Sequence, residues 1–577
     1  MNQNQPTILQ RPFVSFDESS QLHPVLARVY AARNIEVLEE INTGLDSLLA
    51  PDTLTGLDVA VTRLEKALHN QERICVVGDF DADGATSTAL MVTVLTATGF
   101  QKVNYLVPNR FDYGYGLTPE IVTVAAADKP DLIITVDNGI SSIEGVKAAN
   151  DLGISVIITD HHLPAEELPA ADAIVNPNQT GNTFASKNLA GVGVAFYVML
   201  GLRARLRETG WFSEQGITEP KLVDVLDLVA LGTVADVVPL DKNNRILVQQ
   251  GLARIRAGHC RPGIQALIEI SKRSQQRLVA TDLGFCLGPR LNAAGRLEDM
   301  SIGIECLLAT DLSRARQLAV DLDSLNRERR EIETGMQAEA LASIDALGLD
   351  EASLPLGLCL YQPDWHQGVI GILASRIKER FHRPVIAFAN NGDHELKGSA
   401  RSISGLHIRD VLDAVASKQP GLLTKFGGHA MAAGLTIDAD KFEAFKLAFD
   451  QQVQLQLNGR QPEHSLETDG ELSAVDLELE LAELLRYAGP WGQQFPEPLF
   501  DGQFRVVNSR LVGEKHLKLT VVPCDGDQSV DAIAFNQGEH HPLETGAELR
   551  LVYRLDSNEF RGICSLQLVV EYLEVLS

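Results

Sequence analysis

Five short apolar runs in the first half of the chain each end in acidic or polar residues. These segments are Gly78-Asp79-Phe80-Asp81-Ala82-Asp83-Gly84 after 74–77, Val136-Asp137-Asn138-Gly139 after 132–134, Asp160-His161-His162 after 156–158, Asn176-Pro177-Asn178 after 173–175, and Asp236 at the end of 231–236. Short apolar runs that alternate with helical stretches predict parallel strands with crossover helices. Ligands of such sheets bind beyond the carboxyl ends of the strands. Several carboxylates and a histidine at one sheet edge therefore predict a site for divalent metal ions.

The first segment also matches the opening of a calcium-binding EF-hand loop, D-x-D-x-D-G. That loop requires a Glu at its twelfth position, where this chain has Leu90, and a preceding helix, whereas 74–77 predicts a strand. In an extended stretch residues two apart point the same way, so we expect all three carboxylates to face one site. Like charges packed together are costly unless a cation neutralises them. For any single aspartate, a capping or turn role is the alternative.

Length and composition indicate a multi-domain globular protein. A chain of 577 residues is too long for one core, so we expect two to four domains. The hydrophobic content of 45% and the mean hydropathy of −0.01 are typical of globular chains. Residues 1–20 lack a basic segment followed by an apolar one, and acidic residues interrupt the apolar stretch 222–240, so we expect neither a signal peptide nor a membrane span. Seven cysteines without a CxxC pair predict free thiols in a cytoplasmic protein.

The net charge of −27 constrains what the chain can bind. Nucleic-acid-binding proteins are usually basic, so the total charge by itself argues against one. A local basic groove and bound metal ions can still hold a strand that the rest of the surface repels. An acidic surface also disfavours non-specific binding to duplexes.

The chain divides into five stretches. We expect a lead-in at 1–55, an α/β domain with a helical extension at 56–310, a connecting helix at 311–350, a second α/β domain at 351–457 and an antiparallel barrel at 458–577. In the extension, 288–296 is expected to form a Gly/Arg-rich loop. The connecting stretch has helical apolar spacing and no proline, although two shorter helices are an alternative.

These motifs together resemble the DHH phosphoesterase family, named for the triplet Asp160-His161-His162. The resemblance extends from residue 78 to the C-terminus, through Pro108-Asn109-Arg110-Phe111, Gly288-Pro289-Arg290-Leu291-Asn292-Ala293-Ala294-Gly295-Arg296, Lys397-Gly398-Ser399-Ala400-Arg401-Ser402 and Gly427-Gly428-His429-Ala430. Members acting on pyrophosphate or short oligonucleotides usually carry a His four residues before the first paired aspartate. Here that position is Val77, and Asp79 supplies an extra carboxylate, which favours the branch that degrades single-stranded DNA.

The resemblance implies both a fold and an activity. The fold is α/β, with a parallel-sheet DHH domain, a long connecting helix, a second α/β DHH-associated domain and a C-terminal OB-like barrel. The activity is hydrolysis of single-stranded DNA from the 5′ end to 5′-mononucleotides, in DNA repair and recombination. The implied cofactors are two Mn²⁺ or Mg²⁺ ions, and the implied partners are single-stranded DNA, a single-strand-binding protein and a helicase.

The same resemblance assigns the metal ligands. It implies Asp79 and Asp81 on one ion, Asp83, His161 and Asp236 on the other, and Asp137 bridging the two. Carboxylate-rich ligation with one imidazole suits Mn²⁺ or Mg²⁺ better than Zn²⁺. We expect Asp160 to accept from the ring of His161 and orient it. We expect His162 to touch the scissile phosphate, with a buried structural histidine as the alternative.

Substrate-binding residues are expected on both α/β domains. Arg110, Ser399 and Arg401 are assigned to a 5′-phosphate pocket, since guanidinium groups bind phosphate bidentately. Arg110 lies on the first domain and Ser399 and Arg401 on the second, so the two domains are expected to clamp the strand end. Ordinary surface salt bridges are the alternative. Arg290 and Arg296 are expected to contact the strand backbone.

Two further segments are expected to contact DNA. The glycines of 427–428 permit close approach to an anion, which places His429 near a phosphate, although such a motif alone is more often a turn. The barrel segment offers basic residues and aromatic rings for a modest, salt-sensitive contribution to strand capture. These residues are Arg505, Arg510, Lys515, Lys518, Trp491 and Phe504.

Two other functions compete with the exonuclease. One is a phosphodiesterase for short oligonucleotides or cyclic dinucleotides, which rarely needs an added barrel. The other is a non-catalytic replication-fork protein on the same scaffold, in which the metal ligands would be degraded. Every ligand position is intact here. Degradation of single strands with and without Mn²⁺ separates the three.

Overall fold

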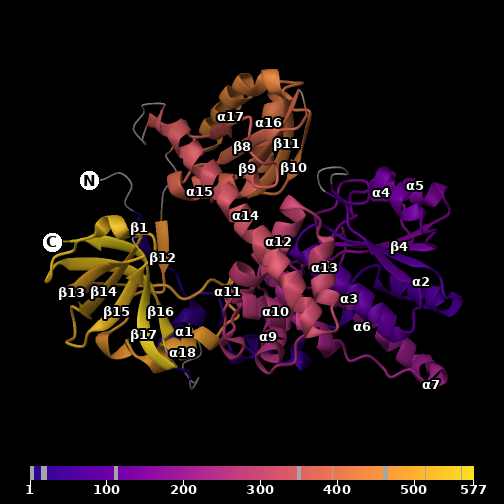
Figure 1. Ribbon diagram of the computed structural model, residues 1–577, viewed down its shortest axis with the longest axis horizontal. Helices are drawn as coiled ribbons and strands as arrows, with labels where there is room; N and C mark the ends of the chain where they lie inside the picture. The colour runs from indigo at the N-terminus through magenta and orange to yellow at the C-terminus, as the bar shows by residue number, and fades with distance from the viewer. Residues whose placement is uncertain are drawn as a thin grey trace. The chain divides into compact units, whose positions relative to one another are not determined.

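The structure is a computed structural model that describes residues 6–14, 22–109, 115–346, 353–392, 394–458, 460, 465–513, 515–560 and 562–576. The chain forms two compact units (Figure 1). One contains Gln10–Asp323 and Glu467–Ser577, and the other contains Met1–Leu9 and Ser324–Leu466. Helix α14 (Leu312–Asp345) contains the boundary at 323–324 and is the single long helix that the sequence predicts.

The first unit is built on a parallel five-stranded sheet in the order β3-β2-β4-β5-β6. Its strands are β2 (Ile74–Val77), β3 (Val103–Leu106), β4 (Leu132–Val136), β5 (Ser155–Thr159) and β6 (Ala173–Val175). Helices α4 (Pro119–Ala126) and α5 (Ile143–Asp151) cover one face, and α2 (Leu57–Asn70), α3 (Ala82–Thr98) and α6 (Gly191–Glu208) the other (Figure 1). Apolar side chains fill both faces of the central strands, as expected for a parallel sheet.

Helices continue this unit beyond the sheet. They are α7 (Trp211–Gln215), α8 (Leu226–Ala235), α9 (Lys242–Arg256), α10 (Pro262–Ile270), α11 (Ala280–Asp282), the π-helical turn η6 (Leu283–Leu287), α12 (Gly288–Leu297) and α13 (Ser301–Leu308). Two expectations were wrong here. The 288–296 segment is a helix and not a loop, since the helix-forming residues Leu291, Ala293 and Ala294 outweigh its two glycines. The run before Asp236 is likewise a helix, and Asp236 is the C-cap of α8.

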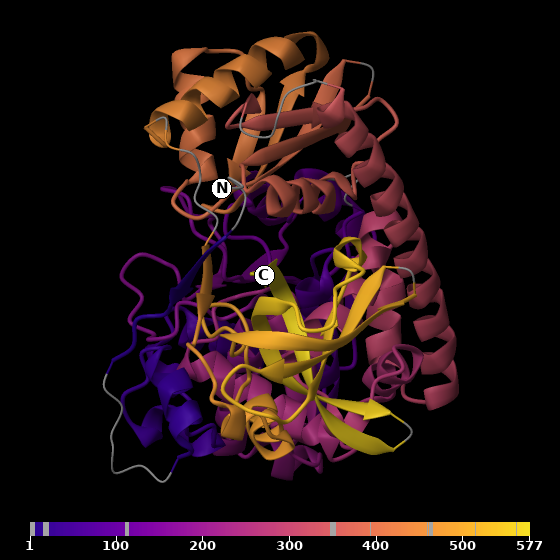
Figure 2. The same ribbon diagram turned by 90° about the vertical axis from the view of Figure 1, so that its left-hand side faces the viewer.

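The tail of the chain forms a closed barrel in the order β13-β14-β15-β17-β16. Its strands are β13 (Phe500–Val512), β14 (His516–Pro523), β15 (Val530–Ala534), β16 (Glu548–Phe560) and β17 (Ile563–Val575), drawn in yellow in Figure 2. Neighbouring strands are antiparallel except for the parallel pair β15 and β17. This is the expected OB-like barrel, and α18 (Leu479–Tyr487) packs against β16.

The lead-in packs on the segment that precedes the barrel. Tyr30 of α1 (Pro24–Ala31) contacts the ring of Trp491, and Arg33 forms a bidentate, buried ion pair with Asp469 at 2.8 and 3.1 Å. Trp491 and Phe504 are only 6% and 2% exposed. Their expected role as stacking platforms for DNA is therefore wrong, because both rings belong to the core.

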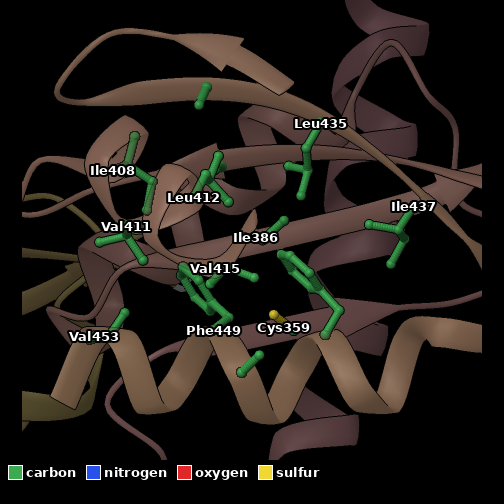
Figure 3. Close-up of a cluster of buried hydrophobic side chains, with 14 of the residues drawn as sticks. Cys359, Ile386, Ile408, Val411, Leu412, Val415, Leu435, Ile437, Phe449 and Val453 are labelled. Atoms are coloured by element: carbon green, nitrogen blue, oxygen red, sulfur yellow. The ribbon is translucent and has the colours of Figure 1, made fainter. Parts of the chain in front are cut away.

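The second unit contains a mixed sheet in the order β10-β11-β9-β8-β7. Its strands are β7 (Leu358–Tyr361), β8 (Val385–Asn390), β9 (Glu395–Arg401), β10 (Lys425–Gly428) and β11 (Ala432–Asp438), and its helices are α15 (Ile370–Phe381), α16 (Ile408–Lys418) and α17 (Phe442–Gln456). Figure 3 shows Phe449 and Val453 of α17 facing Cys359, Ile386 and Leu435 of the sheet. Strands β1 (Thr7–Gln10) and β12 (Ser465–Thr468) form a separate two-stranded sheet.

Two properties hold for the described residues. None of the described helices combines the length and the apolar character that crossing a membrane requires. All seven cysteines are free thiols, as their spacing predicts.

Candidate metal centre

The loop after β2 carries three aspartates that reach two connected parts of one cluster. Asp79 is 5% exposed and lies two residues after the strand, while Asp81 caps α3 by accepting from the N–H groups of Asp83 and Gly84, both at 3.0 Å. Asp83 lies on the first helical turn. The backbone is thus extended only as far as Asp81, and the three carboxylates reach one cluster through two connected groups of ligands. Asp79 and Asp81 gather with Asp137, and Asp83 gathers with other residues.

Asp83 is held by the beginning of α6. Its two carboxylate oxygens accept from the N–H groups of Gly191, at 2.6 Å, and Val192, at 2.9 Å. A helix N-terminus stabilises an anion in this position. A Cβ on Gly232 would lie 2.9 Å from Asp83 Oδ1, so α8 also approaches this carboxylate closely.

Asp137 occupies a strained position at the end of β4. Its φ of +62° lies in the left-handed region, which costs a residue other than glycine about 1–3 kcal/mol. Its Oδ1 atom is buried and accepts no hydrogen bond from the described residues, and it lies 3.1 Å from His161 Nε2. A Cβ on Gly191 would lie 2.6 Å from the same oxygen. Strain that points a buried carboxylate oxygen at other ligands is typical of a functional site.

The Asp-His-His triplet follows β5, and its first residue positions the third. Asp160 is fully buried, and its Oδ1 lies 2.7 Å from His162 Nδ1, while Oδ2 accepts from the N–H of Ile140 at 2.9 Å. From His161, Asp160 Oδ1 accepts a hydrogen bond donated by the backbone N–H, at 2.7 Å. The expectation that Asp160 orients the ring of His161 is therefore corrected: the ring it orients is that of His162.

The six expected metal ligands lie close together in three overlapping groups. Within each group one possible ligand atom per residue lies within 4.8 Å of the others. The groups are Asp79, Asp81 and Asp137; Asp83, His161 and Asp236; and Asp137, His161 and His162. Asp236 enters through its Oδ2, 3.5 Å from His161 Nε2.

The electrostatics of this cluster fit a divalent cation. Burial, and then the neighbouring Asp81 carboxylate, raise the pKa of Asp83 to about 7. Burial and the surrounding carboxylates also raise the pKa of Asp137 and Asp236 well above the usual value for aspartate. Burial acts to lower the pKa of His162, but the hydrogen bond and charge of Asp160 outweigh it and raise this pKa to about 9. Bound cations would stabilise the charged carboxylates, and the oxygen-rich donor set suits hard ions such as Mn²⁺ and Mg²⁺.

Helix α12 supports the first loop from outside. Asn292 Oδ1 accepts from the N–H of Ala82 at 2.7 Å, and a Cβ on Gly295 would lie only 1.8 Å from the carbonyl oxygen of Phe80. Arg290 pairs with Asp323 at 2.8 Å, and its contact with the strand stays a prediction. Arg296 is half-buried in the last turn of the helix.

Three residues that our sequence reasoning did not single out as ligands or supports also contact the centre. The hydroxyl of Tyr115 lies 3.2 Å from the carbonyl oxygen of Asp137 and 3.2 Å from His162 Nδ1. The side-chain amides of Asn176 and Asn178 donate to the carbonyl oxygens of His162 and His161, at 2.9 and 2.6 Å. Asn176 and Asn178 belong to the fourth polar segment of the sequence, and they hold the Asp-His-His loop in place.

The expected phosphate-binding residues of the second unit lie at the start of α15. A Cβ on Gly371, in the first turn, would lie 2.9 Å from Ser399 Oγ and 2.8 Å from Arg401 Nη2. Arg401 donates to Ser399 Oγ at 3.1 Å, burial lowers its pKa, and no carboxylate of the described residues pairs with it. His429 is exposed at the turn between β10 and β11. Arg110 lies outside the described residues.

The fold and the cluster at the carboxyl edge of its parallel sheet define the DHH class of proteins. Comparison with known families agrees: the DHH family N-terminal domain matches residues 73–233, the DHHA1 domain matches 356–455, and the RecJ OB domain matches 468–572.

Individual relatives narrow the class. The single-stranded-DNA-specific exonuclease RecJ of Dickeya dadantii is 58% identical over 98% of both chains. The crystal structure of RecJ from Thermus thermophilus with Mn²⁺ matches with a TM-score of 0.79 at 31% identity, over 96% of this chain and 76% of that chain. The crystal structure with Mg²⁺ matches with a TM-score of 0.73 at 30% identity, over 96% of this chain and 74% of that chain. The chain belongs to the RecJ family.

Proposed function

We propose that this protein is a metal-dependent exonuclease that hydrolyses single-stranded DNA from the 5′ end to 5′-mononucleotides, in DNA repair and recombination. The observation that carries the proposal is the convergence of six ligand-type side chains at the edge of one sheet, in a chain that belongs to the RecJ family. In this proposal residues 56–310 form the catalytic domain, 311–350 the connecting helix, 351–457 the substrate-binding domain and 458–577 the strand-holding barrel, with 1–55 as a lead-in.

The cofactors are Mn²⁺ or Mg²⁺, as in the two related crystal structures. Asp79 and Asp81 would hold one ion, Asp83, His161 and Asp236 would hold the other, and Asp137 would be shared by both. The grouping of these side chains supports this assignment, and so does the buried Asp137 oxygen that accepts no hydrogen bond from the described residues. Two such ions activate an attacking water and neutralise charge on the phosphate.

The protein's own groups orient the scissile phosphate. His162 is held by Asp160, whose hydrogen bond and charge raise the pKa of the imidazole to about 9 and so favour a ring that donates to a phosphate oxygen. Asp160 does no chemistry of its own: it fixes the orientation of the ring. The strained backbone at Asp137 presents its carboxylate without rearrangement, which preserves the geometry of the site between turnovers.

The 5′-phosphate binds at the start of α15. Ser399 and Arg401 lie against the first turn of this helix, where backbone N–H groups favour an anion. A guanidinium without a carboxylate partner among the described residues gains a strong hydrogen bond from a phosphate. Arg110 is assigned to the same phosphate, Arg296 to the strand backbone and His429 to a neighbouring phosphate.

Single-stranded DNA is the substrate, and a single-strand-binding protein and a helicase are proposed as its protein partners. We place the protein in the cytoplasm, where seven free cysteines remain reduced.

The test is degradation of a single strand labelled at either end. With Mn²⁺ present, a 5′ label should appear at once as mononucleotide, whereas a 3′ label should remain on shortening strands. Chelation should stop both reactions and added Mn²⁺ should restore them. A protein that degrades only dinucleotides or cyclic dinucleotides would be a small-substrate phosphodiesterase, and one that binds strands without hydrolysis would be a non-catalytic fork protein.

A further inference from the structure

Two apolar side chains lie exposed beside the charged metal centre. Tyr115 is 49% exposed and Val237 is 63% exposed. Both are close to the ligands, because Tyr115 contacts the backbone of Asp137 and Val237 directly follows Asp236. Single exposed apolar residues are common on protein surfaces. Here, however, both are fixed by contacts or backbone conformations that require an explanation.

The ring of Tyr115 is fixed at both ends. Its hydroxyl lies 3.2 Å from the Asp137 carbonyl oxygen and 3.2 Å from His162 Nδ1. Its ring makes edge-on contacts with Phe80 and His162, at centroid distances of 6.1 and 5.7 Å. An aromatic ring that is half-exposed and yet held in place has lost its freedom before any ligand arrives, so a stacking ligand pays little further entropy.

Val237 is held in an unfavourable conformation. Its φ of +62° is left-handed, and for a β-branched residue this is a genuine outlier. A glycine or asparagine at this position would relieve the strain, and a polar side chain would suit the exposed site. An exposed valine in this conformation therefore does not stabilise the fold, which indicates that its apolar side chain contacts a ligand.

The two residues are connected through the ligands of the cluster. The Tyr115 hydroxyl lies 3.2 Å from the Asp137 carbonyl oxygen, and Asp137 Oδ1 lies 3.1 Å from His161 Nε2. The same nitrogen lies 3.5 Å from Oδ2 of Asp236, which is bonded to Val237 through the backbone. A nucleotide combines a charged phosphate with two less polar parts, a deoxyribose and a flat base. Inorganic phosphate or pyrophosphate has no such apolar parts.

We propose that Tyr115 is the stacking platform for one base of the DNA strand at the cleavage site, and that Val237 packs against the same nucleotide. This inference rests on the proposed function and adds to it two residues that hold the nucleotide by its apolar parts. Stacking tolerates every base, so the platform binds unpaired DNA of any sequence. A base within a duplex is stacked on its neighbours and is not available to the ring.

The first test combines Tyr115→Ala and Tyr115→Phe with strands that carry one abasic site at position one, two or three from the 5′ end. In the wild type, the abasic site at the contacted position should raise KM about five- to a hundredfold. Tyr115→Ala should raise KM for the normal strand by the same factor and should add nothing for that abasic strand. Tyr115→Phe, which keeps the ring, should stay within about threefold of the wild type.

A spectroscopic measurement separates stacking from catalysis. When a strand with 2-aminopurine at the contacted position binds in the presence of Ca²⁺, stacking of this base on the Tyr115 ring should lower its fluorescence. Tyr115→Ala should abolish this decrease. Phe13→Ala, which removes an aromatic ring that is 59% exposed in the lead-in, is the matched control and should leave it unchanged. If Tyr115→Ala lowers activity equally on normal strands and on every abasic strand, Tyr115 is structural and the platform is refuted.

Val237 is tested by separating stability from binding. Val237→Gly relieves the strained backbone and should leave the melting temperature unchanged or higher, while raising KM about three- to tenfold. Val475→Ala, at a site that is 83% exposed, is the control and should change neither. An unchanged KM in Val237→Gly refutes the role of this side chain. If the wild type hydrolyses no strand at all, the proposed function fails, whereas hydrolysis that is insensitive to base removal refutes the platform alone.

Discussion

Gly295→Ala tests whether α12 sets the geometry of the metal centre. The added Cβ would lie 1.8 Å from the Phe80 carbonyl oxygen, whereas real Cβ atoms essentially never approach closer than 3.0 Å. The helix or the loop must therefore move by about 1.2 Å, the difference between these distances. Both partners of the clash are backbone or fixed to it, so no side-chain rotation relieves it. Phe80 lies between Asp79 and Asp81, so the displacement reaches two proposed ligands directly.

The magnitudes separate the effect on folding from the effect on catalysis. Replacing a helical glycine by alanine raises the free energy of unfolding by up to about 1 kcal/mol, while overpacking lowers it by about 1–3 kcal/mol. The net loss of stability should therefore be small. A misplacement of about 1 Å at a catalytic centre costs about a hundredfold in rate. We therefore expect kcat on a short 5′-phosphorylated strand to fall about a hundredfold in saturating Mn²⁺, with the melting temperature little changed.

Gly335→Ala is the matched control. It is also a helical glycine, in α14, but no atom lies within 4 Å of the added Cβ. It should stabilise the protein by about 0.5–1 kcal/mol and leave kcat unchanged. A Gly295→Ala variant with the kcat of the wild type would show that the contact between α12 and the loop does not position the ligands.

Four further predictions concern the rest of the site. Asp137→Ala should abolish hydrolysis without lowering the melting temperature in chelator, because it removes a buried like charge, and near-normal turnover would refute the bridging assignment. Arg401→Ala should raise KM for 5′-phosphorylated strands about ten- to a hundredfold, equivalent to about 1.5–3 kcal/mol, and should raise KM for 5′-hydroxyl strands far less. Equal increases in KM for the two kinds of strand would contradict the phosphate pocket. Asn292→Ala should lower the free energy of unfolding by about 0.5–2 kcal/mol, measured in urea, because it removes the acceptor for the Ala82 N–H. Deletion of 458–577 should leave an aggregating protein that lacks a cooperative unfolding transition, because it exposes the Tyr30 side chain and leaves the Arg33 charge without Asp469. A folded and active truncated protein would show that the barrel is a separable module.

Short-range patterns made the sheet and most of the metal centre predictable. The apolar strands, the acidic residues at their ends and the rule that parallel strands share a carboxyl edge together locate Asp79, Asp137 and His161. The alternating strands of the barrel and the long helix α14 follow from the same periodicities.

What sequence reasoning missed depends on contacts between distant segments. The N–H groups that hold Asp83 come from Gly191 and Val192, more than a hundred residues away, where the sequence shows no sign of an anion-binding turn. The side chain of Asn292 reaches Ala82 across 210 residues. The partner of Asp160 was assigned wrongly because adjacent histidines are equivalent in sequence, and only the direction of each ring separates His161 from His162.

The ion pair between Arg33 and Asp469 joins positions 436 residues apart. During synthesis, Arg33 leaves the ribosome long before its carboxylate partner exists, and at about 5–20 residues per second the delay is tens of seconds. Until then Tyr30 and the guanidinium group of Arg33, which are both buried in the folded protein, are exposed to solvent. The N-terminal segment of this protein is therefore among the last to fold, and nascent chains that stop before Asp469 should be strong substrates for chaperones and proteases.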